Sequence, residues 1–390
     1  MKNRTLYIIN SFPNKSETFI FKEFIFLNKN FKNFHLYSTR FNKADSFFYG
    51  KRFTSIINDL YFFNLRNVSW LYFLKYFNLF FIILNDLKKN NIKRNGLKIY
   101  LNVITIVKIV NLKKINQLHA HWPSAHLISY YVKKLIPGIS LTCSVHAHEV
   151  LHENDHFELV LPLTKKISFC NNAALIKFKE IHPKYSSRCY LNYHGVDTDF
   201  FNADSNNKNS GISIISIGRV TATKGFERLL SFFKKSILDL EMSLTIVGSG
   251  NKEIEEKLSN FKHQNYNYIP WLNQEELKEQ LSKSTFFCLL CDINFHDGIP
   301  NVLVEAMSMS KVCIVSDLPS AKEIILHGDN GFLIDINGDY NKQIFDILYN
   351  FEKGNYNINE IGEKARKTVM SNFDSDYCIN EFKQNIFDED

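Results

Sequence analysis

Short apolar runs alternate with amphipathic segments along most of this chain, and this alternation limits the possible folds more than any other feature of the sequence. The apolar runs have the length of buried strands, and the segments between them have the periodicity of helices. Strands that are joined through helices form parallel sheets, because each connection crosses over the sheet. The expected strands are residues 5–9, 34–38, 117–120, 141–145, 166–170, 212–217, 244–247, 267–269, 285–290, 312–315 and 332–334.

A polar stretch separates this alternation into two series. Residues 202–211 are rich in Asn, Asp, Ser and Gly, as linkers between domains are. A chain of 390 residues is also too long for one compact core. We therefore expect an α/β protein with two Rossmann-like, doubly wound domains that face a cleft, residues 1–203 and residues 204–365, followed by a helical tail, residues 366–390.

The two halves of the chain differ in charge. Residues 1–200 carry 28 Lys and Arg against 12 Asp and Glu, whereas residues 201–390 carry 19 against 28. The basic half is expected to face an anionic partner such as a membrane leaflet, a lipid phosphate or a nucleic acid. A solvated basic surface without a partner is the alternative.

Cysteine usage and the start of the chain both indicate the cytoplasm. The seven cysteines follow no regular spacing, which favours a reducing compartment. The first apolar run, residues 6–9, is too short for the core of a signal peptide.

Residues 70–84 are very apolar, but Lys75 and Asn78 interrupt them. The run is also shorter than the roughly twenty residues of a membrane-spanning helix. An amphipathic helix on a membrane surface and a helix buried in the core both fit this pattern. Five basic residues follow closely: Lys88, Lys89, Lys93, Arg94 and Lys98.

The segment from Asp297 to Glu305 carries the strongest functional signal. Pro300 stands where the first turn of a helix is expected, after a loop that follows a strand. The free N–H groups and partial positive charge of a helix start can bind a diphosphate. Asn301 and Glu305 share one helix face because they are four residues apart. One carboxylate of the segment could hold a ribose and the other the hydroxyls of a sugar.

Three further strand ends carry candidate ligand-binding residues. Gly218 lets the backbone turn closely, and Arg219 and Lys224 after it can reach phosphate oxygens. Gly248 lies in a short glycine turn, which is weak evidence by itself. Residues 12–19 place a polar turn and a helix start after the first strand, where open α/β sheets bind ligands.

In this order, the motifs resemble those of the retaining glycosyltransferases of family 4, which have the GT-B fold. The resemblance is greatest to the exopolysaccharide and lipopolysaccharide biosynthesis type. Eight short motifs carry it over nearly the whole chain: FPNKSETF at 12–19, HAHW at 119–122, SVHAHE at 144–149, HGVDTDFF at 194–201, GRVTATKGFERLL at 218–230, IVGSG at 246–250, DGIPNVLVEAM at 297–307 and DNGFLI at 329–334.

The resemblance implies transfer of a hexose or N-acetylhexosamine from a UDP- or GDP-sugar to a glycan or lipid-linked acceptor in cell-surface polysaccharide synthesis. It also implies that the C-terminal domain binds the donor, that the N-terminal domain binds the acceptor, and that the tail crosses back to the N-terminal domain. No cofactor, metal ion or nucleic-acid partner is expected. The expected location is the inner face of the cytoplasmic membrane, with the basic half against the anionic surface.

Residue roles follow from the same resemblance. The implied catalytic residues are His146, Asp297 and Glu305. The implied donor-binding residues are Gly218, Arg219, Lys224, Gly248, Gly298, Ile299, Pro300, Asn301 and Glu305. The implied acceptor side consists of Ser16, Glu17, Thr18 and His121. Asp297 is one methylene shorter than the Glu that the family usually has there, so its reach to the sugar is left open.

The run His148, Glu149 and His152 matches the HExxH signature of zinc metallopeptidases, with His156 four residues further on. That signature must lie within a helix, but this run directly follows an expected strand. A zinc hydrolase is therefore a remote alternative, and incidental metal binding by these histidines is more plausible than metal catalysis.

Two other patterns favour structural roles. Asp197 and Asp199 form an Asp-x-Asp pattern inside one of the motifs above, and Cys288 and Cys291 lie on one expected strand as core residues. Two alternatives to the transferase stay open. An epimerase or hydrolase of the same fold would turn over the donor without an acceptor, and a catalytically silent partner subunit would turn over nothing.

Overall fold

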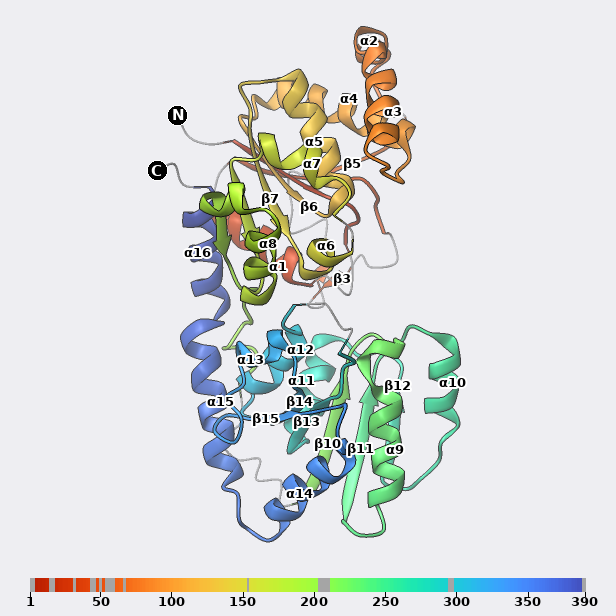
Figure 1. Ribbon diagram of the computed structural model, residues 1–390, viewed down its shortest axis with the longest axis vertical. Helices are drawn as coiled ribbons and strands as arrows, with labels where there is room; N and C mark the ends of the chain where they lie inside the picture. The colour runs from red at the N-terminus through yellow and green to blue at the C-terminus, as the bar shows by residue number, and fades with distance from the viewer. Residues whose placement is uncertain are drawn as a thin grey trace. The chain divides into compact units, whose positions relative to one another are not determined.

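The computed structural model describes residues 4–13, 18–30, 33–42, 47–48, 51–52, 60–65, 68–152, 154–202, 211–293 and 298–387 (Figure 1). They form two compact units, one of Met1–Tyr193 with Ile379–Asp390 and the other of His194–Cys378. Each unit is built around a parallel sheet with helices beside it. The α/β class expected from the sequence is thereby confirmed.

The sheet of the first unit has seven strands in the order β5-β2-β1-β6-β7-β8-β9. Several of these strands are buried along their whole length, as is typical of parallel sheets covered on both faces. The order reverses between β1 and β6, so the carboxyl ends of these two strands border a crevice. The strands are β1 (Thr5–Ile9), β2 (Phe34–Ser38), β5 (Leu60–Phe62), β6 (Gln117–His121), β7 (Ser140–Val145), β8 (Lys166–Phe169) and β9 (Cys189–Leu191).

Helices cover this sheet, and a short antiparallel pair, β3 (Phe47–Phe48) and β4 (Lys51–Arg52), also belongs to the unit. The largest core of the unit lies among α3, α4, α5 and the central strands. The helices are α1 (Thr18–Asn30), α2 (Trp70–Lys75), α3 (Phe77–Lys89), α4 (Gly96–Lys113), α5 (Pro123–Leu135), α6 (Ala147–Leu151), α7 (Phe157–Val160) and α8 (Asn172–Ile181), with 3₁₀ turns η4 (Leu161–Leu163) and η5 (Pro183–Arg188).

The sheet of the second unit has six strands in the order β12-β11-β10-β13-β14-β15, and it reverses between β10 and β13. Its strands are β10 (Ile212–Ile217), β11 (Met242–Val247), β12 (Tyr266–Ile269), β13 (Phe286–Leu289), β14 (Val312–Ser316) and β15 (Phe332–Ile334). Its helices are η6 (Ala222–Lys224), α9 (Phe226–Ser236), α10 (Lys252–Asn260), α11 (Gln274–Ser282), α12 (Asn301–Ser308), α13 (Pro319–Lys322), α14 (Tyr340–Glu352) and α15 (Ile358–Asn372).

The last helix, α16 (Ser375–Ile386), begins in the second unit, and its residues from Ile379 onward belong to the first. Ile379, Phe382 and Ile386 join a core cluster with residues of β1, β2 and α1. The side chain of Gln117 in β6 also donates to the carbonyl of Ile386, with an N···O distance of 3.3 Å. The end of the chain is thus an integral part of the first unit's core.

The apolar run at 70–84 forms two amphipathic helices. In α3, Leu79, Ile83 and Leu87 are buried against the core, while other apolar side chains face solvent. Helix α2 has no buried residue, and Trp70 and Leu71 are strongly exposed. Within the described ranges, no helix combines the length and hydropathy needed to cross a bilayer.

Phe382→Ala is expected to lower the free energy of unfolding of the first unit by about 3–5 kcal/mol, because it leaves a cavity in a closed core. Phe382 is only 3% exposed, and its ring lies 5.3 Å from that of His119 between centroids. Guanidinium unfolding in a Trp271→Phe background would measure the effect, because the remaining tryptophans, Trp70 and Trp122, both lie in the first unit.

Tyr377→Ala is the matched control, since Tyr377 lies on the same helix but is 52% exposed. It should change the free energy of unfolding by less than about 0.5 kcal/mol. Equal losses in the two variants would contradict the role given to α16 in this core.

Candidate functional site

The crevice of the first unit gathers polar side chains from the carboxyl ends of neighbouring strands. His119 and His121 lie on β6, His146 directly follows β7, and Cys170 directly follows β8. Tyr7 of β1 pairs in register with His119, so these two side chains share one face of the sheet. The three histidines and Tyr7 are all buried.

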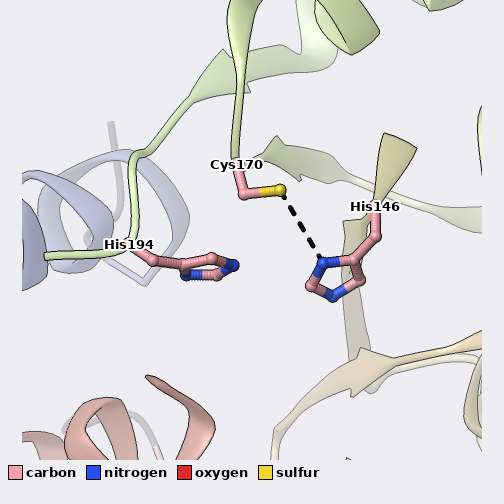
Figure 2. A group of neighbouring side chains, drawn as sticks. All are labelled: His146, Cys170 and His194. Carbon is pink, nitrogen blue, oxygen red and sulfur yellow. Dashed lines mark hydrogen bonds between the residues drawn. The ribbon is translucent and has the colours of Figure 1, made fainter. Parts of the chain in front are cut away.

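His146 is held on several sides. Its ring stacks on that of Trp122, with 3.9 Å between centroids and 16° between planes. Its Nδ1 lies 3.8 Å from Cys170 Sγ. The dashed line in Figure 2 marks this contact. As the N-cap of α6, it also donates its backbone N–H to Glu149 Oε2 at 2.9 Å, which fixes the turn that carries the ring.

A chain of hydrogen bonds runs from His146 into the core. Its Nε2 is 3.3 Å from His121 Nδ1, and His121 Nε2 is 2.5 Å from the Tyr7 hydroxyl. Tyr7 in turn donates to Glu23 Oε2 at 2.6 Å. Burial, and then the charge of Glu23, raise the pKa of Tyr7 well above its usual value, so this hydroxyl keeps its proton.

These bonds assign the tautomers. Because the Tyr7 hydroxyl donates to Glu23, it accepts from His121, whose Nε2 must carry the proton. His121 Nδ1 is then an acceptor and receives the Nε2–H of His146. His146 Nδ1 is left as an acceptor for the Cys170 thiol. The network therefore fixes both the orientation and the protonation of the His146 ring.

His119 extends the network to β7. Its Nδ1 is 2.9 Å from Thr142 Oγ1, and its Nε2 is 3.0 Å from Ser144 Oγ. Thr142 donates its own hydroxyl proton to Leu118 O, so it accepts from His119. Burial lowers the pKa of His119 to about 3, and the ring is therefore neutral at physiological pH.

In the second unit, two glycines bring the strand-end loops together at the reversal of the sheet. Gly225 has φ of 72°, and a Cβ there would lie 1.8 Å from Leu290 O, just after β13. A Cβ on Gly248 would lie 1.9 Å from Gly218 O. Only glycine permits either approach, so the loop after β10 packs closely against both the loop after β11 and the loop after β13.

Further bonds fasten this junction. The backbone N–H of Asp292 donates to Thr223 O at 2.8 Å, and Arg228 pairs with the Asp292 carboxylate. The aliphatic part of Lys224 lies 4.0 Å from the position of a Cβ on Gly218. The loop after β10 thus brings Arg219 and Lys224 to the carboxyl ends of the central strands.

Helix α12 begins at the same edge of the sheet, because it follows β13. Its N-cap is Pro300, and its first residue is Asn301. Gly298 and Ile299 precede it and are partly exposed. Glu305, one turn into the helix, is only 4% exposed. The predicted donor-binding residues that the structure describes therefore come from the loops and the helix that follow β10, β11 and β13.

Some predicted residues cannot be placed. Ser16, Glu17 and Asp297 lie outside the described residues, and only the backbone of Thr18 is described, as the first residue of α1. His121 is fully buried and touches His146, so it reaches any substrate only through that ring. Its expected place on the acceptor side stays a prediction.

Sequence reasoning assigned no role to Tyr7, Glu23, Trp122 or Cys170. Two features of the sequence could have indicated Tyr7 and Cys170. Tyr7 is a polar-tipped residue in the middle of a buried strand, and Cys170 follows the next strand end after the one that carries His146. Glu23 and Trp122 could not be placed without knowing the packing of α1 and the unusual backbone of Trp122, which has φ of 78°.

The Asp-x-Asp pattern and the cysteine pair, for which the sequence favoured structural roles, lie in a turn and in the core. Asp197 Oδ1 accepts from the N–H of Phe200 in a turn, and Cys288 and Cys291 are buried. The HExxH run lies on α6 and its C-cap, so the expectation that it would not lie within a helix was wrong. His148 and His152 are nevertheless exposed, whereas Glu149 is buried and bonds the His146 backbone. This run therefore does not bring its two histidines and its Glu to one zinc-hydrolase site.

Comparison with known proteins agrees with this architecture. Residues 197–368 match the model of the family "Glycosyl transferases group 1". HepE from Anabaena, solved in complex with UDP, superposes with a TM-score of 0.74 over 98% of both chains, at 12% identity.

Two curated proteins are similar in sequence. N-acetyl-alpha-D-glucosaminyl L-malate synthase from Bacillus anthracis is 22% identical over 301 residues, which cover 73% of this chain and 77% of that protein. An uncharacterised glycosyltransferase from Haemophilus influenzae is 30% identical over 132 residues, which cover 32% of this chain and 35% of that protein.

Two doubly wound units with this topology, and the superposition over the whole chain, define a protein of the GT-B fold. Nearly the whole second unit also matches the group 1 glycosyltransferase model. The chain thus has the GT-B fold, and its second unit is similar to the glycosyl transferases of group 1.

The stability of the protein is expected to depend on pH through His119. The folded protein leaves this ring neutral down to about pH 3, whereas the unfolded chain takes up a proton below about pH 6.5. The free energy of unfolding therefore falls as the pH falls from about 6.5 towards 3, by about 1 kcal/mol at pH ~5.5 from this residue alone.

Guanidinium unfolding at a series of pH values would measure this slope. His119→Gln should flatten it, because the titrating group is gone. His148→Gln, which replaces an exposed histidine, should leave the slope as in the wild type. An unchanged slope in His119→Gln would rule out this residue as the source.

Proposed function

We propose that this protein is a retaining glycosyltransferase that moves a sugar from a UDP- or GDP-sugar to a glycan or lipid-linked acceptor in cell-surface polysaccharide synthesis. The observation that carries the proposal is the arrangement of loops at the β10–β13 reversal. It combines glycine-closed loops, two cationic side chains and the start of α12. This combination suits a diphosphate.

The donor would bind in the second unit. Arg219 and Lys224 pair with the diphosphate oxygens, and the free N–H groups at the start of α12 bind the same group. Glu305 takes the ribose hydroxyls, and Asp297 takes the donor sugar. The solved complexes of HepE with UDP and with UDP-glucose support a nucleotide sugar as the donor class.

In the reaction, the bond between the anomeric carbon and the diphosphate oxygen breaks, and its electron pair leaves with the diphosphate. The cations and the helix start stabilise this growing negative charge, so the transfer step itself needs no metal ion. The acceptor hydroxyl attacks from the face that the diphosphate leaves, and its proton passes to an oxygen of the departing diphosphate. His146, held in one orientation by the buried network, is the residue of the first unit that would face the donor sugar.

The first unit would bind the acceptor at the inner face of the cytoplasmic membrane. The exposed apolar residues of α2 provide a surface that can enter the interface of a bilayer. Lys88, Lys89, Lys93, Arg94 and Lys98 follow it and favour anionic lipids.

A small soluble acceptor is the second candidate, because a relative that covers most of the chain is named for the transfer of N-acetylglucosamine to L-malate. Incubation with a panel of UDP- and GDP-sugars, with lipid-linked glycans, with L-malate or with no acceptor, would separate the possibilities. A glycan product supports the first candidate. Donor turnover without an acceptor would indicate a hydrolase or epimerase, and no turnover with any donor would indicate a silent subunit.

Arg219→Ala and Lys224→Ala are each expected to lower kcat/KM for the donor about tenfold to a hundredfold. A hydrogen bond from a charged group to phosphate contributes about 1.5–3 kcal/mol. Lys257→Ala is the control, since Lys257 lies on the same unit but pairs with Glu227 at 3.0 Å. Near-normal kcat/KM in both Arg219→Ala and Lys224→Ala would refute the phosphate assignment.

Binding to vesicles of phosphatidylglycerol and phosphatidylcholine tests the membrane surface. The double variant Trp70→Asp with Leu74→Asp should bind at least about tenfold more weakly, because burial of each apolar side chain contributes about 1.5–3 kcal/mol. Leu238→Asp, at an exposed leucine of the second unit, should bind like the wild type. If all three proteins sediment equally with vesicles, α2 is not the contact.

A further inference from the structure

A second buried cluster lies beside the His146 network in the first unit. It consists of His126 on α5, Glu149 on α6 and His156 just before α7. Their exposed fractions are 1%, 1% and 0%. One ligand atom from each residue lies within 4.8 Å of the other two. We propose that these three side chains form a buried zinc site, with His126 Nδ1, His156 Nε2 and Glu149 Oε1 as the protein ligands.

The proton of His126 is placed by its surroundings. Its Nε2 lies 3.1 Å from Ala120 O and 3.0 Å from Ser144 O, and carbonyl oxygens only accept hydrogen bonds. Nε2 therefore carries the proton, and Nδ1 presents a lone pair. A metal-bound histidine usually donates its other ring N–H to a carbonyl or carboxylate in this way.

His156 has a matching environment. Its Nδ1 lies 3.6 Å from Asp155 Oδ1, and this carboxylate favours a proton on Nδ1. With the proton on Nδ1, the Nε2 of His156 presents a lone pair to His126 Nδ1, only 2.9 Å away.

The carboxylate of Glu149 is the third group that points to the same place as the two rings. Glu149 Oε1 lies 3.4 Å from His126 Nδ1, so a carboxylate oxygen faces an imidazole lone pair. A single proton on His126 Nδ1 could bridge the two rings and pair with the carboxylate. A zinc ion instead accepts a lone pair from all three ligand atoms at once. With zinc–ligand bonds of about 2.0–2.1 Å, tetrahedral ligand atoms lie roughly 3.3 Å apart, close to the separations of 2.9 and 3.4 Å found here.

The ligand types select zinc among the common ions. Two imidazoles and one carboxylate form a set that zinc binds in proteins, whereas Ca²⁺ and Mg²⁺ prefer oxygen ligands. The ion would tie α5, α6 and the start of α7 together. Glu149 uses its other oxygen to accept the N–H of His146, so the ion would also fix the turn that carries this ring. The site differs from the HExxH pattern, of which it uses only Glu149.

The test is the zinc content of the whole chain after purification and dialysis, measured by plasma mass spectrometry. The wild type should hold about one zinc per chain, because a buried three-ligand site exchanges slowly and binds tightly. His126→Ala and His156→Ala should hold about tenfold less. The double variant His148→Ala with His152→Ala is the control. It removes an exposed histidine pair with 5.1 Å between ring centroids, and it should keep the zinc.

Because a variant could lose zinc simply by failing to fold, the wild-type protein is also measured directly. Unfolding in guanidinium with a chromogenic chelator should release the same single equivalent of zinc. The metal-free protein should show a raised thermal midpoint with added Zn²⁺, and the visible absorption of tetrahedral Co²⁺ with added Co²⁺. A wild type that is purified without zinc and shows neither response would overturn the proposal in favour of a proton bridge. Loss of zinc in the exposed-pair control would also overturn it.

Discussion

The reversal of strand order in each parallel sheet is the constraint on which the rest of the molecule depends. At β1 and β6 in the first unit, and at β10 and β13 in the second, neighbouring strands send their connections to opposite faces, so their carboxyl ends stay open. The histidine network occupies one of these edges, and the loops with Arg219 and Lys224 occupy the other. Topology thus decides where the sites lie, and side chains decide their chemistry.

Because the histidine network of the first unit is buried, each of its polar groups needs a defined hydrogen-bond partner. A buried donor or acceptor that loses its partner costs about 1–3 kcal/mol. From Glu23 through Tyr7 and His121, each group therefore dictates the proton position of the next, and His146 receives one orientation. In the second unit the backbone fixes the positions of the strand-end loops, because Gly225 and Gly248 allow close contacts that no other residue could make.

Most of the fold could be predicted because the periodicity of the chain agrees with its tertiary structure. The expected strands match the observed ones to within two residues at either end, including β1 and β10. The strands β5 and β9 were missed because three partly buried residues at a sheet edge leave little apolar signal. Motif order placed His146 and Glu305 near their strand ends. The partners of His146 were missed because contacts such as Tyr7 to Glu23 arise from packing, which a local pattern does not record.

The path of α16 has a consequence for the order in which the protein is made. Ile379, Phe382 and Ile386 are needed to close the core formed by β1, β2 and α1, yet more than three hundred residues separate them from those strands. On the ribosome, the first unit therefore waits with an open core until these residues emerge. The unit that is synthesised second has all of its strands available earlier, so it can complete its fold first.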